Sequence, residues 1–506
     1  MSHRTIELQQ DYAARLAQAL VYEAGERESA QAAFDRSHGR GPAFAGLAAL
    51  RRQEYGRLDA RAQVYLDYTG GGLYAQSQLD AHMAQLATNV YGNPHSSNPT
   101  SMAATKLVDQ ARDYVRHYFN ADPAEYAVIF TANASGALKL LGESYPFEQD
   151  GQYLLTFDNH NSVNGIREYA VHHNARVQYA PISLPDLGLN EATMRALLTE
   201  PATGPNRLFA FPAQSNFSGV QHDLAWVNFA REQGWDVLLD CAAYVPTNRL
   251  DLAELKPDFV PLSFYKMFGY PTGLGALLAR RETLRKLRRP WFAGGTVEMV
   301  SAMASIFARA SDEAAFEDGT ISYLQIPAVE IGLRHLEKVG IDQVHERVAG
   351  LTGYMLEGLH EIRHSNGEPV VLVYGPQDMT ARGGTIAFNL LDPQGNTFDV
   401  LLVETLANQA QISLRTGCFC NPGAGENVFN LTIDDVTACS SDLSSLTFDR
   451  YIAALTERTG RNITGAVRVS LGIASNAADV YHFLKFLRTF VDLKSPGFMH
   501  AVADHG

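Results

Sequence analysis

Short apolar runs that alternate with helix-length segments constrain the fold of this chain more than any other feature. Seven such runs lie between residues 127 and 279. This alternation predicts an α/β domain built on a mainly parallel, seven-stranded sheet. Ligands of open α/β sheets bind beyond the carboxyl ends of the strands, so functional residues are expected there. The runs are residues 127–131, 153–158, 176–180, 207–212, 236–240, 259–263 and 275–279.

The regions on either side of this alternation differ from it. Residues 1–62 are rich in helix-forming residues, with apolar positions three or four apart, which predicts an N-terminal helical segment. We expect a large domain over residues 63–327 and a smaller α+β domain over residues 328–506. Residues 427–462 are polar and irregular, which predicts a mobile or inserted region. The smaller domain is predicted from a helical stretch at 328–362 and short apolar runs at 369–374, 384–390, 412–415 and 466–470.

Composition narrows the class of protein. The chain has 506 residues and a formal net charge of −14, which argues against nucleic acid or an anionic membrane as its main partner. The N-terminus lacks the apolar core of a signal peptide, and no run approaches the roughly 18 apolar residues of a membrane span. Four cysteines in so long a chain do not make a disulfide framework, so we expect a cytoplasmic protein.

Lys266 follows the apolar run 259–262 and precedes a Gly/Pro turn. A lysine at the end of a buried strand has its pKa lowered by desolvation, which makes the amine a nucleophile for aldehydes. Pyridoxal 5'-phosphate (PLP) enzymes use such a lysine to hold the cofactor as a Schiff base and to move protons. The alternative is a surface lysine in a hairpin loop.

Other polar residues follow the predicted strands. Asp240 could hold the protonated pyridine nitrogen of PLP or could cap the next helix. His160 could stack on a cofactor ring and move protons, or it could be structural. Ser135 lies at a strand-to-helix junction that suits a phosphate, although serine is also a common N-cap. The glycines 70–72 lack the Gly-Lys-Ser/Thr ending of a nucleotide loop.

The glycine-flanked segment 414–423 holds Cys418 and Cys420. The Cys-x-Cys spacing lacks the second ligand pair of a zinc site, and a disulfide between these cysteines would be strained. A thiolate beside an arginine better fits a nucleophile. Arg468, a charge inside a strand pattern, suits either capture of a substrate carboxylate or a salt bridge between elements.

Six segments together resemble the class V aminotransferase/cysteine desulfurase superfamily. Within it, the chain is most similar to the amino-terminal desulfurase domain of molybdenum cofactor sulfurases. The resemblance covers about residues 65–491. The segments are residues 65–72, 91–96, 158–163, 263–275, 415–423 and 465–472.

This resemblance implies the PLP-dependent fold type I and a homodimer with active sites at the subunit interface. It makes Lys266 the Schiff-base lysine, Asp240 the partner of the pyridine nitrogen and His160 the stacking imidazole. It also assigns Cys420 to the position of the sulfur-accepting cysteine. The remaining implied site residues are Ala134, Ser135 and Ser263 at the phosphate, Tyr265 and Asn216 at the cofactor, Thr320 reaching the neighbouring subunit's phosphate, and Arg468, Arg415 and Asn216 at the substrate.

Three positions depart from the family pattern. Ala243 stands where many desulfurases have a glutamine that contacts the ring hydroxyl, so that contact must come from elsewhere or be missing. Gly425 replaces a further cysteine of the sulfurase branch. The chain ends at Gly506. That length leaves no room for the carboxy-terminal domain of full-length sulfurases, so we expect no direct role in sulfurating molybdenum cofactor.

The leading hypothesis is a PLP-dependent cysteine desulfurase that converts L-cysteine to alanine and a Cys420 persulfide, with a sulfur-acceptor protein as partner. A second hypothesis keeps PLP and changes the reaction to aminotransfer, racemisation, elimination or C–C bond formation, because the fold alone does not decide function. A third is a non-catalytic scaffold. Of the two loop cysteines, we predict that Cys420 is mobile and reactive and that Cys418 is structural.

Overall fold

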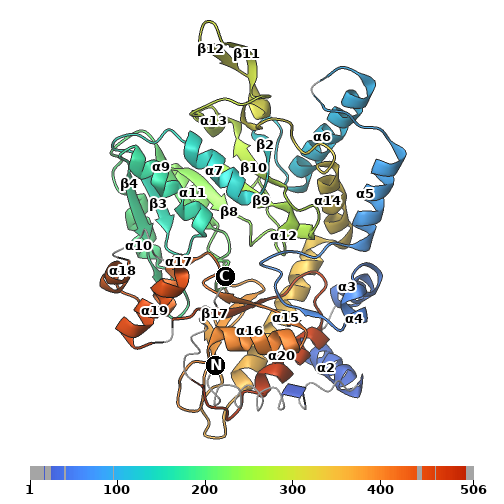
Figure 1. The fold of residues 1–506 in the computed structure, drawn as a ribbon, viewed down its shortest axis with the longest axis vertical. Coiled ribbons are helices and arrows are strands. Elements are labelled where there is room, and N and C mark those ends of the chain that lie inside the picture. The colour runs from blue at the N-terminus through green and yellow to red at the C-terminus, as the bar shows by residue number, and fades with distance from the viewer. Residues whose placement is uncertain are drawn as a thin grey trace.

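The computed structural model describes residues 16–17, 24–38, 42–94, 96–440, 447–461 and 463–496. Its central feature is a seven-stranded sheet in the upper half of Figure 1. The strands run in the order β2-β10-β9-β8-β7-β3-β4 across the sheet. Their bounds are Tyr126–Thr131 (β2), Gln152–Thr156 (β3), Arg176–Ala180 (β4), Arg207–Pro212 (β7), Asp236–Asp240 (β8), Phe259–Ser263 (β9) and Gly275–Arg280 (β10).

Each predicted run corresponds to one of these strands, with bounds that differ by two residues at most. The pairs β3–β4, β3–β7, β7–β8 and β8–β9 are parallel. Only β10 runs antiparallel to its neighbours β2 and β9. The prediction of a mainly parallel, seven-stranded sheet is therefore confirmed.

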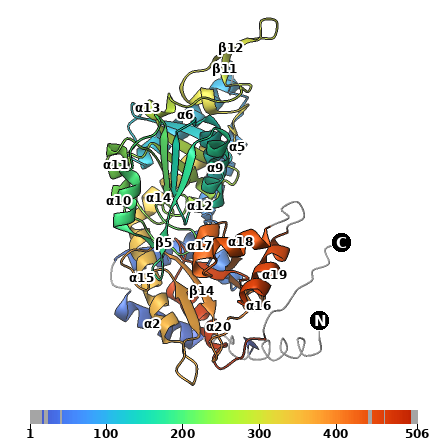
Figure 2. The same cartoon turned by 90° about the vertical axis from the view of Figure 1, so that its left-hand side faces the viewer.

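The sheet is covered on both faces, which explains why its strands read as continuous apolar runs. Successive side chains of a strand point to opposite faces. In β2, accordingly, Val128 belongs to one core cluster and Ile129 to the other. Figure 2 shows α10 (Glu191–Leu198) and α11 (Ala225–Glu232) on one side and α9 (Ile166–His172) on the other.

The chain after residue 327 builds a second, smaller sheet, below the first in Figure 1. Its four strands are antiparallel and lie in the order β13-β14-β17-β16. The expected helical stretch at 328–362 is two helices, because Gly340 has a φ of +87° and ends the first. The elements are α14 (Pro327–Val339), α15 (Ile341–Glu361), β13 (Val371–Tyr374), β14 (Thr385–Leu390), α16 (Val400–Gln409), β15 (Ile412–Ser413), β16 (Arg415–Gly417), β17 (Ala466–Ser470) and α20 (Ala477–Arg488).

The described part of the N-terminal segment is helical, as expected, and packs on this C-terminal region. Helix α2 (Ala24–Ser37) contacts α20, and α3 (Pro42–Glu54) contacts α15. After the short α4 (Arg57–Ala60), β1 (Val64–Tyr65) pairs in parallel with β15. The division of the chain into domains at residues 62 and 327 remains a prediction.

The described residues of the segment 427–462 are mostly helical and not irregular, while the expectation that the region is mobile or inserted remains a prediction. They contain α18 (Ile433–Cys439) and α19 (Phe448–Thr459). Thr432 and Asp435 form a capping box at the start of α18, and Thr447 caps α19. Their polar composition reflects exposed two-turn and three-turn helices held by caps. Residues 441–446 and 462 lie outside the described residues.

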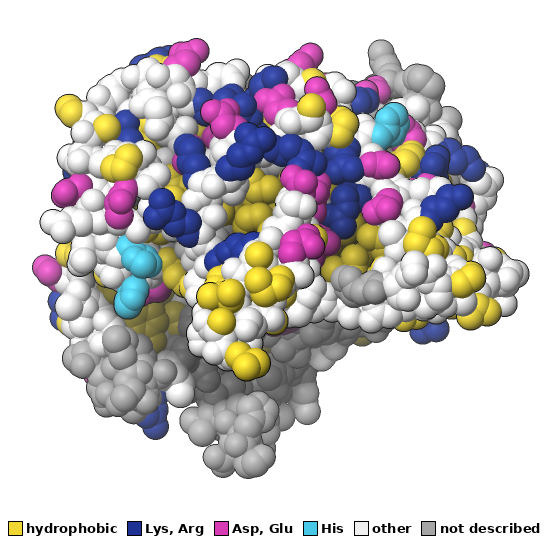
Figure 3. Space-filling model, turned by 90° about the horizontal axis from the view of Figure 1, so that it is seen from above, with side chains coloured by type: hydrophobic (Ala, Val, Ile, Leu, Met, Phe, Trp, Pro, Cys, Tyr) yellow, Lys and Arg dark blue, Asp and Glu magenta, His cyan; other side chains and the backbone are white. Residues whose placement is uncertain are grey.

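A two-stranded ribbon of β11 (Val297–Ser301) and β12 (Ile306–Arg309) projects from the top of the molecule. Apolar side chains gather on it in the view from above (Figure 3). Exposed apolar residues on this ribbon are Met299, Val300, Met303, Ile306 and Phe307. The other elements that position the site are α5 (Gln76–Thr88), α6 (Pro99–Tyr118), α7 (Ala134–Ser144), α8 (Asn161–Asn164), α12 (Phe264–Phe268) and α17 (Pro422–Val428).

Candidate active site

One pocket lies beyond the carboxyl ends of the parallel strands and collects most of the predicted site residues. Segments that follow β2, β3, β7, β8 and β9 all contribute to its wall. This is the position at which open α/β sheets bind ligands. The predicted residues that line it are Ala134, Ser135, His160, Asn216, Asp240, Ser263, Tyr265 and Lys266.

Lys266 lies on α12, three residues beyond the end of β9. Burial lowers the pKa of its amine, and the nearby charges of Arg468 and Arg415 lower it further, while Asp240 raises it. Lys266 lies on a helix and lines the pocket, so the alternative of a lysine in a surface hairpin loop does not describe its position. A buried amine with a lowered pKa is a nucleophile suited to an aldehyde.

Asp240 and His160 both precede Lys266 in the sequence and share its pocket. Asp240 is buried at the end of β8, and its Oδ1 accepts a hydrogen bond from the Ala242 N–H at 3.0 Å. His160 Nδ1 accepts from the Ser162 N–H at 3.1 Å, which leaves Nε2 to carry the proton of the neutral ring. Burial lowers the pKa of His160, so the neutral ring is favoured.

The N-terminus of α7 opens on the same pocket. Asn133, not Ser135, is the N-cap, because its side chain accepts from the Gly136 N–H at 2.8 Å. The interpretation of Ser135 as an ordinary cap is thereby corrected. Its hydroxyl instead lies 2.6 Å from the Ser162 hydroxyl, and Ser263 Oγ accepts from the Ala134 N–H at 3.0 Å. Hydroxyls at a helix N-terminus are suitable donors for a phosphate.

The two loop cysteines have different surroundings. Phe419 and Cys420 both have positive φ, at 55° and 56°, so the loop is turned and not extended. Cys420 is exposed and lies near enough to Lys266 and Arg468 to affect the pKa of both. Cys418 is half-buried, and desolvation raises the pKa of its thiol to about 11. The two thiols therefore differ in exposure, while the mobility and reactivity of Cys420 remain a prediction.

Backbone and amide hydrogen bonds hold the cysteine loop beside the pocket. The Cys420 carbonyl accepts from the Asn161 N–H at 2.7 Å, next to His160. Asn216 Nδ2 donates to the Phe419 carbonyl at 2.7 Å. Asn421, fully buried, donates to Asn216 Oδ1 at 2.9 Å and to the Asp158 carbonyl at 2.6 Å. Asn216 therefore connects the pocket wall to the loop.

Arg468 and Arg415 lie opposite each other on β17 and β16 and share one carboxylate. Asp67 accepts from Arg468 Nη2 at 3.0 Å and from Arg415 Nη2 at 2.6 Å. Arg468 Nη1 also donates to the Asn216 carbonyl at 2.9 Å. The salt bridge that was the alternative for Arg468 is thus present, and it lies next to the pocket residue Asn216.

Four predicted site residues are not among those that line this pocket: Thr320, Arg415, Cys420 and Arg468. Thr320 lies on a different loop. It is exposed, and Asn93 Nδ2 donates to its hydroxyl at 3.2 Å. Asp67, Ser162 and Gln214 belong to the site region, yet the sequence analysis did not select them. Asp67 directly follows an apolar pair in the segment 64–67, the same signal that drew attention to Asp240.

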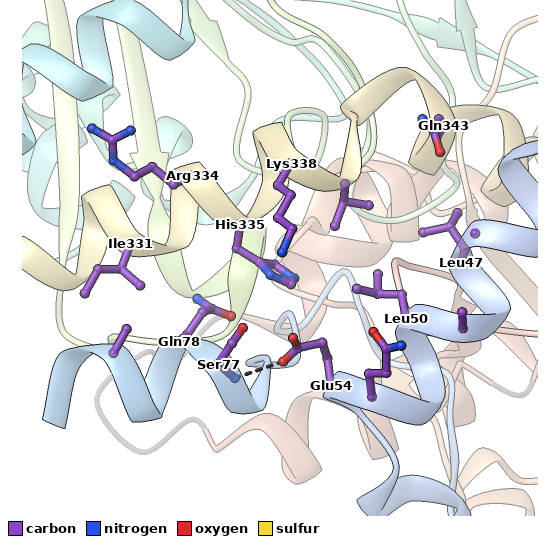
Figure 4. A pocket seen from close by; sticks show the side chains of 15 residues that line it. Leu47, Leu50, Glu54, Ser77, Gln78, Ile331, Arg334, His335, Lys338 and Gln343 are labelled. Atoms are coloured by element: carbon purple, nitrogen blue, oxygen red, sulfur yellow. Dashed lines mark hydrogen bonds between the residues drawn. The ribbon is translucent and has the colours of Figure 1, made fainter. Parts of the chain in front are cut away.

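A second cavity, drawn in Figure 4, contains none of the predicted residues. It lies between α3, α5 and α14. Glu54 and Ser77 face each other across it, with the Ser77 N–H bonded to the Glu54 carboxylate at 2.9 Å. Its buried histidine, His335, is bonded to the Tyr55 hydroxyl at 3.1 Å. Glu54 and Lys338 both line this cavity, and neither was selected by the sequence analysis.

Comparison with known proteins identifies the family. The model of the aminotransferase class-V family matches residues 64–483, so the chain belongs to that family. The pocket fits PLP in this structure, because it joins a buried amine, a buried carboxylate, a neutral imidazole and hydroxyls at a helix N-terminus. The chain is a PLP-dependent enzyme with the type I fold.

Relatives and solved structures agree with this assignment. Molybdenum cofactor sulfurase of Arabidopsis thaliana is 36% identical over 475 residues, which is 87% of this chain and 57% of the relative. The chain therefore spans little more than half the length of this curated relative. A cysteine desulfurase of Thermococcus onnurineus NA1 has a TM-score of 0.70 at 21% identity, covering 88% of this chain and 98% of that one.

A further solved structure carries a different activity on the same fold. The cystine C-S lyase C-DES, in complex with its reaction product cysteine persulfide, has a TM-score of 0.65 at 18% identity. The match covers 87% of this chain and 100% of that one.

Within the described residues, the helices are all too short or too polar to cross a membrane.

Proposed function

We propose that this enzyme is a cysteine desulfurase, which cleaves the C–S bond of L-cysteine and leaves the sulfur on Cys420. The observation that carries the proposal is the placement of the Cys420 thiol. It is exposed on a loop whose Cys420 carbonyl is bonded to the Asn161 N–H beside His160, and it lies near enough to Lys266 and Arg468 to affect the pKa of both. A nucleophilic thiol close to a PLP lysine suits transfer of a sulfur atom.

The site residues have distinct roles in this reaction. PLP, when bound, supplies an electron sink for the substrate's α-carbon. Lys266 would hold the cofactor and move the α-proton, Asp240 would keep the pyridine nitrogen protonated, and the neutral His160 ring would lie against the cofactor. Ala134, Ser135 and Ser263 hold the phosphate. Tyr265 and Asn216 complete the cofactor wall, while Arg468 and Arg415 hold the substrate carboxylate.

Sulfur transfer then needs a single nucleophile. The Cys420 thiolate attacks the sulfur of the substrate, and the C–S bond breaks with its electron pair remaining on carbon. Protonation of that carbon gives alanine, and the sulfur stays on Cys420 as a persulfide. A reductant or an acceptor protein takes the sulfur in the next step.

The test is product analysis of the PLP-loaded protein with L-cysteine, with and without a reductant. Cys420→Ala should lower alanine formation by about a hundredfold or more, because it removes the nucleophile. Cys418→Ala is the matched control and should retain most activity. The extra mass of 32 Da for one sulfur, roughly, should be found on Cys420 in the native protein. Full alanine formation by Cys420→Ala would overturn the persulfide mechanism.

A different PLP reaction is the competing outcome of this experiment. One fold carries both a desulfurase and a C–S lyase among the solved structures, so fold does not decide between them. Titrating the PLP-loaded protein with a set of amino acids separates the alternatives. A spectral change with another amino acid and none with cysteine would favour aminotransfer, racemisation, elimination or C–C bond formation.

The proposal extends to the assembly of the protein. We infer a cytoplasmic homodimer that delivers sulfur to an acceptor protein. Thr320 and the apolar ribbon β11–β12 support a contact with a second copy. The N–H of Gly319 donates to the Gly294 carbonyl at 2.8 Å, so the base of the ribbon and the Thr320 loop form one unit. An exposed apolar patch of this kind is typical of an interface.

A further inference from the structure

Asp67 is a buried carboxylate to which neither the proposed reaction nor the sequence analysis gave a role. Its side chain is 11% exposed and lies between the guanidinium groups of Arg468 and Arg415. Arg468 is itself 3% exposed. Two of its three nitrogens bond to Asp67 and to the Asn216 carbonyl, while Nε is buried with no hydrogen-bond partner among the described residues. A buried donor of this kind is expected to meet an acceptor, here an incoming carboxylate.

The glycine turn after Asp67 allows the carboxylate to contact the two arginines. A Cβ on Gly70 would lie 2.5 Å from Asp67 Oδ2 and 2.7 Å from Arg415 Nη2. A Cβ on Gly72 would lie 2.7 Å from the Lys266 carbonyl. The turn therefore needs glycine at both positions, because a larger residue would separate Asp67 from the arginines or the turn from α12.

The same segment is fixed to the strand that carries Arg468. The Ser470 N–H donates to the Leu66 carbonyl at 2.7 Å, and the Thr69 N–H donates to Ser470 Oγ at 2.8 Å. Asp67 and Ser470 form a parallel bridge. The carboxylate is therefore held at a set position two residues from Arg468 along β17.

The net charge of Asp67, Arg415 and Arg468 together is +1. Arg468 and Arg415 carry two positive charges, and Asp67 cancels one, which leaves one positive charge for the substrate. Both arginines also lower the pKa of Lys266. Without Asp67, the site would present two uncompensated cations, which would attract a second carboxylate.

We propose that Asp67 is a positioning residue that fixes Arg468 and Arg415 and restricts the site to amino acids with one carboxylate. The inference rests on the proposed role of Arg468 in substrate binding. It names the substrate class as neutral monocarboxylic amino acids, to which L-cysteine belongs. Aminodicarboxylates are excluded because Asp67 repels their second carboxylate and leaves it no free cation.

The experiment measures binding, so that it does not depend on C–S cleavage. The PLP-loaded protein is titrated with L-alanine and with L-aspartate, and the absorbance change of the cofactor gives the two dissociation constants. Asp67→Asn should weaken L-alanine binding by about tenfold, because the arginines lose their anchor. It should also strengthen L-aspartate binding relative to L-alanine binding by about tenfold, because one arginine charge is no longer neutralised by Asp67.

Asp479→Asn is the matched control. Asp479 is also a buried carboxylate on an arginine, 2.6 Å from Arg51, but it lies on α20 away from the pocket. It should cost stability and leave the ratio unchanged. Arg415→Gln provides the opposite charge change at a half-exposed side chain and should move the ratio away from L-aspartate by about threefold.

The possible results separate the two proposals. A folded Asp67→Asn protein with an unaltered ratio would overturn the role of Asp67, as would a shift in the same direction for Arg415→Gln. If Asp67→Asn fails to fold, the direction of the Arg415→Gln shift alone decides. Alanine formation from L-cysteine tests the desulfurase proposal separately, so a protein that prefers L-alanine but releases no alanine from cysteine would refute only that proposal.

Discussion

At the scale of single residues, burial gives two cysteines of one loop opposite properties. Cys418 packs against Gly425, where an added Cβ would lie 3.4 Å from its sulfur, and burial raises the pKa of its thiol to about 11. Cys420 is exposed next to the pocket. Because the thiolate is the reactive form, a thiol with a pKa near 11 is about 0.1% ionised at pH 8.

Limited alkylation should therefore distinguish the two cysteines and depend on pH. At pH 8, iodoacetamide should label Cys420 first, as mass spectrometry of the digested protein will show. Labelling of Cys418 should increase by roughly tenfold for each pH unit up to about 11, because its thiolate fraction increases in that proportion. Cys420→Ser is the control that isolates the slow reaction. Faster labelling of Cys418 at pH 8 would contradict the assignment.

At the scale of elements, the cysteine loop depends on one buried amide. Asn421 caps α17 through its Oδ1, which accepts from the Ala424 N–H, and its Nδ2 donates to Asn216 and Asp158. A turned loop with two residues at positive φ needs such support, because non-glycine residues in that region are strained.

Asn421→Ala should release the loop while leaving the cofactor pocket intact. Alanine formation from L-cysteine should fall by at least about tenfold, because the Cys420 thiol is no longer held near the substrate. PLP absorbance should be retained. Asn427→Ala is the matched control, since it removes a single bond from the same helix, to the Ile182 carbonyl. Equal losses in both variants would show that loop position is not what matters.

The sheet was predictable from sequence because its strands are buried on both faces, so each appears as an unbroken apolar run such as 236–240. The strand-end residues Asp240 and Lys266 followed from that pattern. Asp67 follows a short apolar run, as Asp240 does, but its pairing with Arg415 and Arg468, about 350 and 400 residues away, leaves no signal in the local sequence. The helices α18 and α19 were missed because their segment is polar in composition and their apolar residues, such as Leu455, pack in a small local cluster with Phe429 and Ile463.

At the scale of the whole molecule, the predicted position of Thr320 at a neighbouring subunit's phosphate requires a dimer. In the single chain, Thr320 lies outside the pocket that holds Lys266, on the loop that supports the apolar ribbon. If a second copy supplies this hydroxyl, assembly and cofactor binding are coupled, because the site is complete only in the dimer.

The protein should therefore have twice the 55.5 kDa mass of the chain when measured by light scattering. Thr320→Ala should weaken PLP binding by about tenfold, the effect of losing one hydrogen bond to a charged group, without changing the mass. Met303→Glu should act through the dimer. It places a charge on the fully exposed ribbon tip, which should dissociate the dimer and thereby weaken PLP binding. Ser322→Ala, an exposed hydroxyl on the same loop, is the control for Thr320→Ala. The proposal would be overturned if the unsubstituted protein were a 55.5 kDa monomer and if neither Thr320→Ala nor Met303→Glu changed its affinity for PLP. Each chain would then complete its own site.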